Sequence, residues 1–229
     1  RTDWVTADRK WITNVLIPGE QAQHTAPTAY RAGSVHRQRW FGPVQRPRLV
    51  DEPDGLNIFR QEGGWFFANI PGWGDSGAAH AGNTNDNPGA DNRLTLYQGD
   101  RMVGTNDRYN ALLKAGPLAP QVLPYRLVSE NNRDAWAGPY STATRTEWSF
   151  TCGDVKPGTI YSPPLIQLDY DVDTDRDGRV RRNFDLTVTT ATLATATDPG
   201  VVRTVTLDVS YDDGATWHRT NLRPRAGGW

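Results

Sequence analysis

The stretch Arg93-Leu94-Thr95-Leu96-Tyr97 alternates polar and apolar residues, which is typical of a β-strand with one buried face. Gln98-Gly99-Asp100-Arg101 follows and has the composition of a turn. Met102-Val103-Gly104 is then expected to return as the second strand of an antiparallel hairpin. This hairpin sets the expectation for the whole chain, which is an all-β fold.

Short runs of aromatic and β-branched residues lie on both sides of this hairpin, and Pro or Gly bounds many of them. The 22 Gly and 16 Pro residues favour many turns and disfavour long helices. We expect one short helical turn at residues 111–115 and a long loop without periodicity at residues 71–92. The other expected strands are 2–5, 10–15, 39–44, 56–60, 65–70, 125–129, 145–150, 165–170, 184–189 and 205–211.

The stretch Gly153-Asp154-Val155-Lys156-Pro157-Gly158 interrupts the strand pattern and predicts a boundary between two β-sandwich-like domains, at residues 1–152 and 160–229. Beyond it, apolar and polar residues alternate as in antiparallel strands with one solvated face. We therefore expect an immunoglobulin-like or fibronectin type III-like second domain. Because the chain ends at Gly227-Gly228-Trp229, soon after a strand pattern, we expect this domain to be incomplete and the chain to be a piece of a longer polypeptide.

Composition excludes several classes of function. The net charge of −1 gives no basis for binding nucleic acid or an acidic membrane surface. No apolar run approaches the roughly 20 residues that a transmembrane helix needs. The single cysteine, Cys152, excludes an internal disulfide and a cysteine-rich zinc site.

The stretch Gly74-Asp75-Ser76-Gly77 matches the surround of the nucleophilic serine in chymotrypsin-like proteases, and its Asp-Ser-Gly part matches the aspartate motif of subtilisin-like proteases. A nucleophilic serine needs a histidine base that a carboxylate orients. The only histidines before Ser76 are His24 and His36, and neither lies in the sequence context of a catalytic histidine. We expect turn-forming residues here and no catalytic centre.

The acidic stretch 169–180 is the candidate metal site. Asp173, Asp175 and Asp177 are spaced like the first ligands of a calcium loop, and Gly178 occupies the position of its sharp turn. Such a loop needs a bidentate carboxylate at its twelfth position, where this chain has Phe184. The pattern therefore predicts either a Ca²⁺ site or the solvated face of a strand that enters an Asp-Gly turn.

Two further features carry hypotheses about binding. Residues 210–217 fit the pattern Ser-x-Asp-x-Gly-x-Thr-Trp of an Asp-box hairpin, in which Asp and Ser bind the turn backbone and Trp packs beneath it. Trp73 and Trp136 stand near polar, loop-like sequence and could form an aromatic platform for a sugar. Tryptophan in a small sandwich is more often a core residue, and both interpretations stay open.

Several segments together resemble the region C-terminal to the catalytic domain in large secreted subtilisin-like serine peptidases of actinobacteria. The resemblance rests on the order of these segments along nearly the whole chain. They are 1–5, 30–34, 39–43, 75–82, 94–100, 125–127, 141–150, 168–172 and 209–217.

The resemblance implies a non-catalytic, β-rich accessory region of a secreted peptidase, whose catalytic Asp, His and Ser would lie upstream. Its partner would be the subtilisin-like catalytic domain of the same polypeptide, with a protein or glycan substrate, and no nucleic acid or membrane. The alternative function is a carbohydrate or cell-wall binding module. A hydrolase that uses Ser76 is the third hypothesis.

Overall fold

The computed structural model describes residues 2–51, 57–76, 80–84, 87–107, 112–135, 140–175, 177–180, 182, 184–212, 214–225 and 227–229. Within these residues the chain forms antiparallel strands and no α-helix, so the all-β expectation is confirmed. One 3₁₀ turn, η1 (Glu62–Gly64), connects two of the strands. The described residues contain no helix that is long and apolar enough to cross a membrane.

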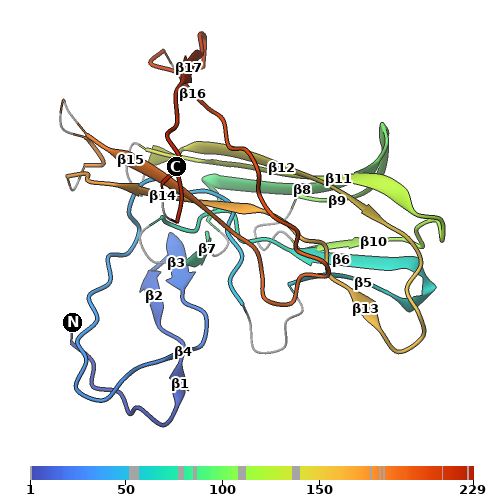
Figure 1. Cartoon of the computed structure of the whole chain (residues 1–229), viewed down its shortest axis with the longest axis horizontal. Helices are drawn as coiled ribbons and strands as arrows, with labels where there is room; N and C mark the ends of the chain where they lie inside the picture. The colour runs from blue at the N-terminus through green and yellow to red at the C-terminus, as the bar shows by residue number, and fades with distance from the viewer. Residues whose placement is uncertain are drawn as a thin grey trace.

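The strands follow one another from the N-terminal blue end to the C-terminal red end of Figure 1. In chain order they are β1 (Lys10–Trp11), β2 (Asn14–Ile17), β3 (Gln21–His24), β4 (Thr28–Ala29), β5 (Ile58–Gln61), β6 (Trp65–Asn69), β7 (Ala81–Asn83), β8 (Ala90–Gln98), β9 (Arg101–Asn106), β10 (Leu112–Ala115), β11 (Leu123–Arg133), β12 (Ala143–Cys152), β13 (Ile160–Tyr161), β14 (Gln167–Val172), β15 (Leu186–Ala191), β16 (Leu207–Val209) and β17 (His218–Thr220).

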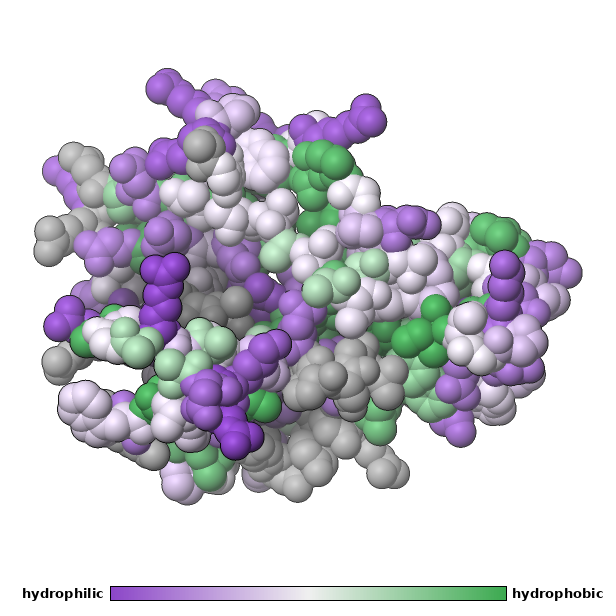
Figure 2. All heavy atoms as spheres, turned by 60° about the horizontal axis from the view of Figure 1, so that its bottom comes forward, coloured by the Kyte–Doolittle hydropathy of each residue, from purple (hydrophilic) through white to green (hydrophobic). Residues whose placement is uncertain are grey.

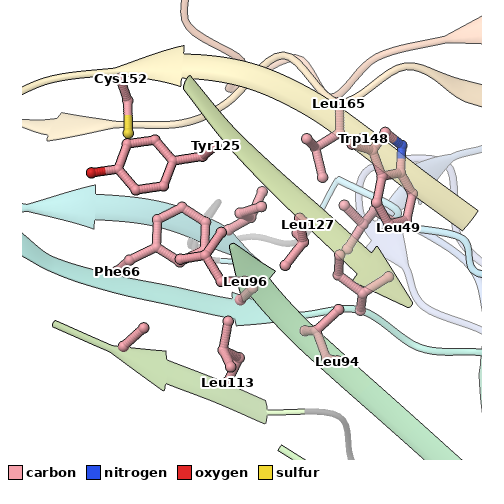
Figure 3. Close-up of a cluster of buried hydrophobic side chains, with 14 of the residues drawn as sticks. Leu49, Phe66, Leu94, Leu96, Leu113, Tyr125, Leu127, Trp148, Cys152 and Leu165 are labelled. Atoms are coloured by element: carbon pink, nitrogen blue, oxygen red, sulfur yellow. The ribbon is translucent and has the colours of Figure 1, made fainter. Parts of the chain in front are cut away.

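Two four-stranded sheets form the centre of the molecule, with the strand orders β10-β6-β5-β13 and β12-β11-β8-β9. They appear as two layers in Figure 1, and their facing side chains form one apolar core. Figure 3 shows Phe66 and Leu113 of the first sheet pointing toward Leu96 and Leu127 of the second. Each fully buried side chain of this size contributes roughly 1.5–3 kcal/mol, so this core holds the two sheets together.

The hairpin predicted at residues 93–104 is confirmed. β8 pairs with β9 in antiparallel register, and a bulge follows Leu96. Leu94 and Leu96 are fully buried, whereas Arg93 on the same strand is exposed. Alternation in the sequence therefore identifies the core face of this strand, although Thr95 on the opposite side is buried as well.

Four local expectations are wrong. Residues 112–115 form the strand β10 and no helical turn, because this segment pairs with β6 and buries Leu113 and Ala115 against the core. Residues 2–5 and 39–44 form no regular strand. The segment 71–92 contains β7, which pairs with β3, as well as the start of β8.

The region after residue 153 contributes to the central sheets and core. β13 pairs with β5, and Leu165 and Leu193 belong to the buried cluster. The chain then forms the separate pairs β14-β15 and β16-β17. The expected boundary at residues 153–160 is thus crossed by strand pairing and by core packing.

The face drawn in Figure 2 is mainly hydrophilic or neutral, and its apolar residues form small separate groups. Exposed apolar residues of the chain include Trp4, Leu16 and Val35 near the N-terminus. Scattered exposed apolar side chains are usual for a folded domain and define no binding surface by themselves.

Candidate functional site

The glycine-rich stretch at residues 72–76 is buried between two other backbone segments. Arg46 and Gly74 exchange backbone hydrogen bonds of 3.0 Å on one side, and the amide of Trp73 donates to the carbonyl of Gly82 at 2.9 Å on the other. A Cβ atom on Gly74 would overlap the carbonyl oxygen of His80, and one on Gly82 would overlap that of Trp73. These glycines are therefore required by close backbone approach.

Trp73 is fully buried, so its ring is not a surface platform in this structure. Its Nε1 donates to Oδ1 of Asn92 at 2.8 Å, and the guanidinium of Arg133 lies 5.3 Å from its ring centroid. Its carbonyl accepts hydrogen bonds from the side chains of Gln21 and Gln23, at 3.0 and 2.9 Å. Trp73 thus organises a buried polar network. Trp136, the other predicted platform residue, lies outside the described residues.

Asp75 and His80 lie together under Trp40. Nδ1 of His80 is 2.8 Å from Oδ1 of Asp75, although the contact does not have hydrogen-bond geometry. The rings of Trp40 and His80 stack with centroids 3.7 Å apart and an interplanar angle of 3°. Both side chains of the Asp75–His80 pair are essentially inaccessible to solvent. No spacing rule in the sequence connects His80 to a partner, whereas the fold brings it to a carboxylate.

The hydroxyl of Ser76 is directed away from this pair. It donates to the carbonyl of Val44 at 2.8 Å. A serine nucleophile instead needs its hydroxyl bonded to the base that removes its proton. The described residues therefore bring a buried Asp–His pair next to a serine without joining them into a catalytic relay.

Two buried arginines connect this stretch to β14. Arg48 makes a two-pronged ion pair with Asp169, at 2.8 and 3.1 Å, and Arg46 also bonds to the Asp169 carboxylate. Arg46 further donates to the carbonyls of Gly74 and Leu168, at 3.0 and 2.8 Å. Burial, partly offset by Asp169, lowers the pKa of Arg46. Sequence reasoning missed this cluster, because its members stand far apart in the chain.

The Asp-rich segment forms a turn that its own groups satisfy. Oδ1 of Asp175 accepts the amides of Asp177 and Arg179, each at 2.9 Å, and Asp177 pairs with the Arg179 guanidinium at 3.2 Å. Arg39 donates to the carbonyl of Asp175 at 2.9 Å. Asp173, Asp175 and Asp177 are not gathered into a ligand set, and the described residues contain no cluster of three metal-ligating side chains. The Asp-Gly turn describes this geometry better than a preformed calcium cage.

A cavity of about 280 Å³ lies between the end of the 72–76 stretch and residues 170–173, where the Asp-rich segment begins. Asp75, Ser76, Asp171 and Asp173 line it, together with Arg39. The guanidinium of Arg39 is already engaged with backbone carbonyls, and Asp171 and Asp173 are exposed. The cavity thus has a mainly acidic lining that solvent reaches.

The Asp-box motif forms a turn between β16 and β17. The carboxylate of Asp212 accepts the amide and the hydroxyl of Thr216, at 2.9 and 2.6 Å, and Ser210 Oγ accepts the amide of Gly214 at 2.8 Å. The bonds that this carboxylate accepts from Thr216, led by that from the hydroxyl, and from Ser210 Oγ at 2.8 Å lower the pKa of Asp212 to about 2. The ring of Trp217 lies against the turn, with Nε1 bonded to the carbonyl of Gly214 at 3.1 Å, while its other side is exposed to solvent.

The single cysteine is a core residue. Its sulfur lies 3.6 Å from the guanidinium of Arg60, which is fully buried and donates to the carbonyl of Ala119 at 2.7 Å. Burial raises the pKa of the Cys152 thiol despite this cation. A protonated, inaccessible thiol is a poor nucleophile.

Comparison with known proteins returns no relative. No family model matches the chain, and neither a curated protein nor a solved structure is significantly similar to it.

Proposed function

We propose that this chain is a non-catalytic accessory region of a secreted subtilisin-like serine peptidase. It would stabilise or position the catalytic domain of the same polypeptide, or help that domain to hold a protein substrate. In this proposal the two facing sheets form the first β-sandwich-like unit, and β14–β17 form part of an immunoglobulin-like or fibronectin type III-like unit. The order of the family-like segments along the chain supports this assignment.

The contacts of the protease-like motif 74–77 support the non-catalytic part of the proposal. The hydroxyl of Ser76 binds the carbonyl of Val44, and His80 is enclosed between Trp40 and Asp75. A substrate carbonyl would need access to the serine oxygen and to a base beside it. Here these groups hold a loop in place, which suits a scaffold better than an enzyme.

The arginine cluster supports a role in mechanical support. Arg46 and Arg48 join the 72–76 stretch to Asp169 on β14, so the central sheets and the C-terminal strands are tied by buried ion pairs. A module that positions another domain needs such internal rigidity, because motion within the module would change the position of the partner domain.

A fluorophosphonate probe and a casein hydrolysis assay test the absence of catalysis. We expect the purified chain to remain unlabelled and inactive, and Ser76→Ala to behave identically. Labelling of the wild type that disappears in Ser76→Ala would contradict the proposal and support a hydrolase. A subtilisin-like peptidase with an intact triad serves as the positive control.

The accessory role is tested in the parent polypeptide. We expect catalytic motifs upstream of residue 1, and a shorter half-life of peptidase activity at elevated temperature when residues 1–229 are deleted. Equal half-lives and equal cleavage of protein substrates with and without this region would count against the role. Binding of the isolated chain to chitin, cellulose or peptidoglycan would favour the carbohydrate-binding alternative instead.

A further inference from the structure

The strand β12 (Ala143–Cys152) lies at the edge of its sheet and has β11 as its only strand partner among the described residues. It pairs with β11 from Cys152 back to Ala143. Its outer edge therefore presents backbone groups that no neighbouring strand uses. Edge strands of this kind can add a further strand from another chain.

The hydrogen-bond pattern identifies which residues present these groups. The amide of Arg133 donates to the carbonyl of Thr142 at 2.8 Å, so the pair 133/142 is a hydrogen-bonded pair of the β11–β12 ladder. Such pairs alternate along an antiparallel ladder, which directs the backbone groups of the even-numbered residues toward β11. The odd-numbered residues Ala143, Arg145, Glu147 and Ser149 direct theirs outward.

These four residues open onto a groove of about 480 Å³. Residues 143–149 line one side of the groove, and residues 44–47 and 164–168 line the other. Nε1 of Trp148 donates to the carbonyl of Ile166 at 2.8 Å, so the second wall lies beneath the inner face of the sheet. In the described part of the chain, no backbone group of the four residues has a hydrogen-bond partner.

We propose that β12 pairs edge to edge with β12 of a second copy of this chain, about a two-fold axis through Thr146. In this antiparallel register Arg145 faces Glu147 of the second copy, and Ala143 faces Ser149. All of these are outward-directed residues, so every pair can exchange two backbone hydrogen bonds. The exposed and buried faces of the two sheets also stay aligned.

Charge selects this register over its neighbours. Cross-strand partners of opposite charge stabilise a sheet, and like charges directly opposite each other destabilise it. Moving the axis by one residue places Arg145 opposite its own copy, or Glu147 opposite its own copy. Within one chain, Arg145 pairs with Glu130 at 3.5 Å and with Glu147 at 2.7 Å. The register centred on Thr146 adds Glu147 of the second copy to this row of alternating charges on the exposed face of the sheet. The result is a symmetric, self-complementary interface.

Sedimentation velocity across about a hundredfold range of concentration tests the interface. We expect the wild type to dimerise, and Glu147→Arg or Arg145→Glu to raise the dissociation constant of the dimer at least about tenfold, because each creates like-charged pairs. An equimolar mixture of the two variants should dimerise again, since every pair across the axis is then opposite in charge. The double variant R145E/E147R should also dimerise by itself.

Arg101→Glu is the matched control, because Arg101 is an exposed arginine on β9 at the opposite edge of the same sheet. It should leave the dissociation constant unchanged, and thermal melts should show that all variants are folded. A wild type that stays monomeric overturns the proposal. So does a dissociation constant that the charge changes leave unaltered, or a mixture of the two variants that does not dimerise. A monomer that binds an extended peptide along β12 would show that the occupant is another polypeptide. The proposed accessory function does not depend on any of these outcomes.

Discussion

The Asp-box turn at residues 210–217 and the glycine-rich stretch at residues 72–76 are both turns rich in small polar residues, yet they are stabilised in opposite ways. In the Asp-box turn, Ser210, Asp212 and Thr216 bond to groups at most four residues away. In the 72–76 stretch, the carbonyl of Trp73 is bound by Gln21, 52 residues away in the chain. One turn is local and exposed, and the other is distributed and buried.

This difference determines what each turn contributes to the fold. An exposed turn competes with water for every hydrogen bond, so its net effect on stability is modest. A buried network has no water to replace a missing partner, so its loss is costly. We therefore expect changes around residues 72–76 to affect the whole molecule, and changes in the Asp-box turn to act locally.

The largest effect should come from Asp169→Ala, which leaves Arg46 and Arg48 without their shared carboxylate. Removing one partner of a buried ion pair typically costs 3–5 kcal/mol, and because Asp169 is partly accessible we expect about 3 kcal/mol. The free energy of unfolding from urea denaturation measures it. The control is Asp208→Ala, which removes an exposed partner of Arg219 and should cost less than about 1 kcal/mol. Equal effects of the two changes would contradict the comparison.

A slightly smaller effect should come from Gly74→Ala. The new Cβ would overlap the carbonyl of His80 and crowd the side chain of Arg48. Overpacking of this kind costs typically 1–3 kcal/mol, and we expect about 2 kcal/mol in the same denaturation experiment.

Gly42→Ala is the matched control for this substitution, because only the flexible side chain of Arg39 lies within 4 Å of its Cβ position. It should change stability by less than about 1 kcal/mol, and it can even stabilise by restricting the unfolded chain. A tolerated Gly74→Ala would mean that the strands around the stretch can separate at little cost.

Much of the fold could be predicted from local patterns. The alternation in 93–97 identifies β8 because Leu94 and Leu96 face the core, and the apolar residues in 125–129 identify β11, whose two faces are both buried at Leu127 and Val128. The Asp-box turn could also be predicted, because its hydrogen bonds join residues of its own motif. In 111–115 the local pattern fails, because pairing with β6 overrides helix propensity.

The buried polar network could not be predicted, because its partners are distant in the chain. Arg46 and Asp169 are 123 residues apart, and no spacing rule connects them. The sequence leaves Trp73 open between a core residue and a surface platform, and the structure buries it among polar side chains. Gly72 and Gly74 on both sides of Trp73 are the usable signal, since glycine marks sites where another segment approaches the backbone closely.

The smallest effect on the stability of the whole chain should follow protonation of Asp212. Its contribution to stability should decrease as the pH falls. The hydrogen bonds from Thr216 and Ser210 lower the pKa of Asp212 to about 2, so this carboxylate binds protons less readily when the turn is formed. Its stabilising effect is complete above the ordinary value of about 4 and falls as the pH drops toward 2. Below the folded pKa the contribution is lost.

NMR amide shifts of Gly214 and Thr216 between pH 5 and 1.5 would follow this change. We expect a midpoint near the lowered pKa of Asp212, with the amide of Trp73 unchanged until the whole chain unfolds. Asp212→Asn should abolish the titration and leave the urea denaturation curve nearly unaltered. A midpoint near 4 would mean that the Thr216 bonds are not formed in solution. Simultaneous loss of the Trp73 signal would show that the Asp-box turn is coupled to the buried network, and the contrast between local and distributed turns would fail.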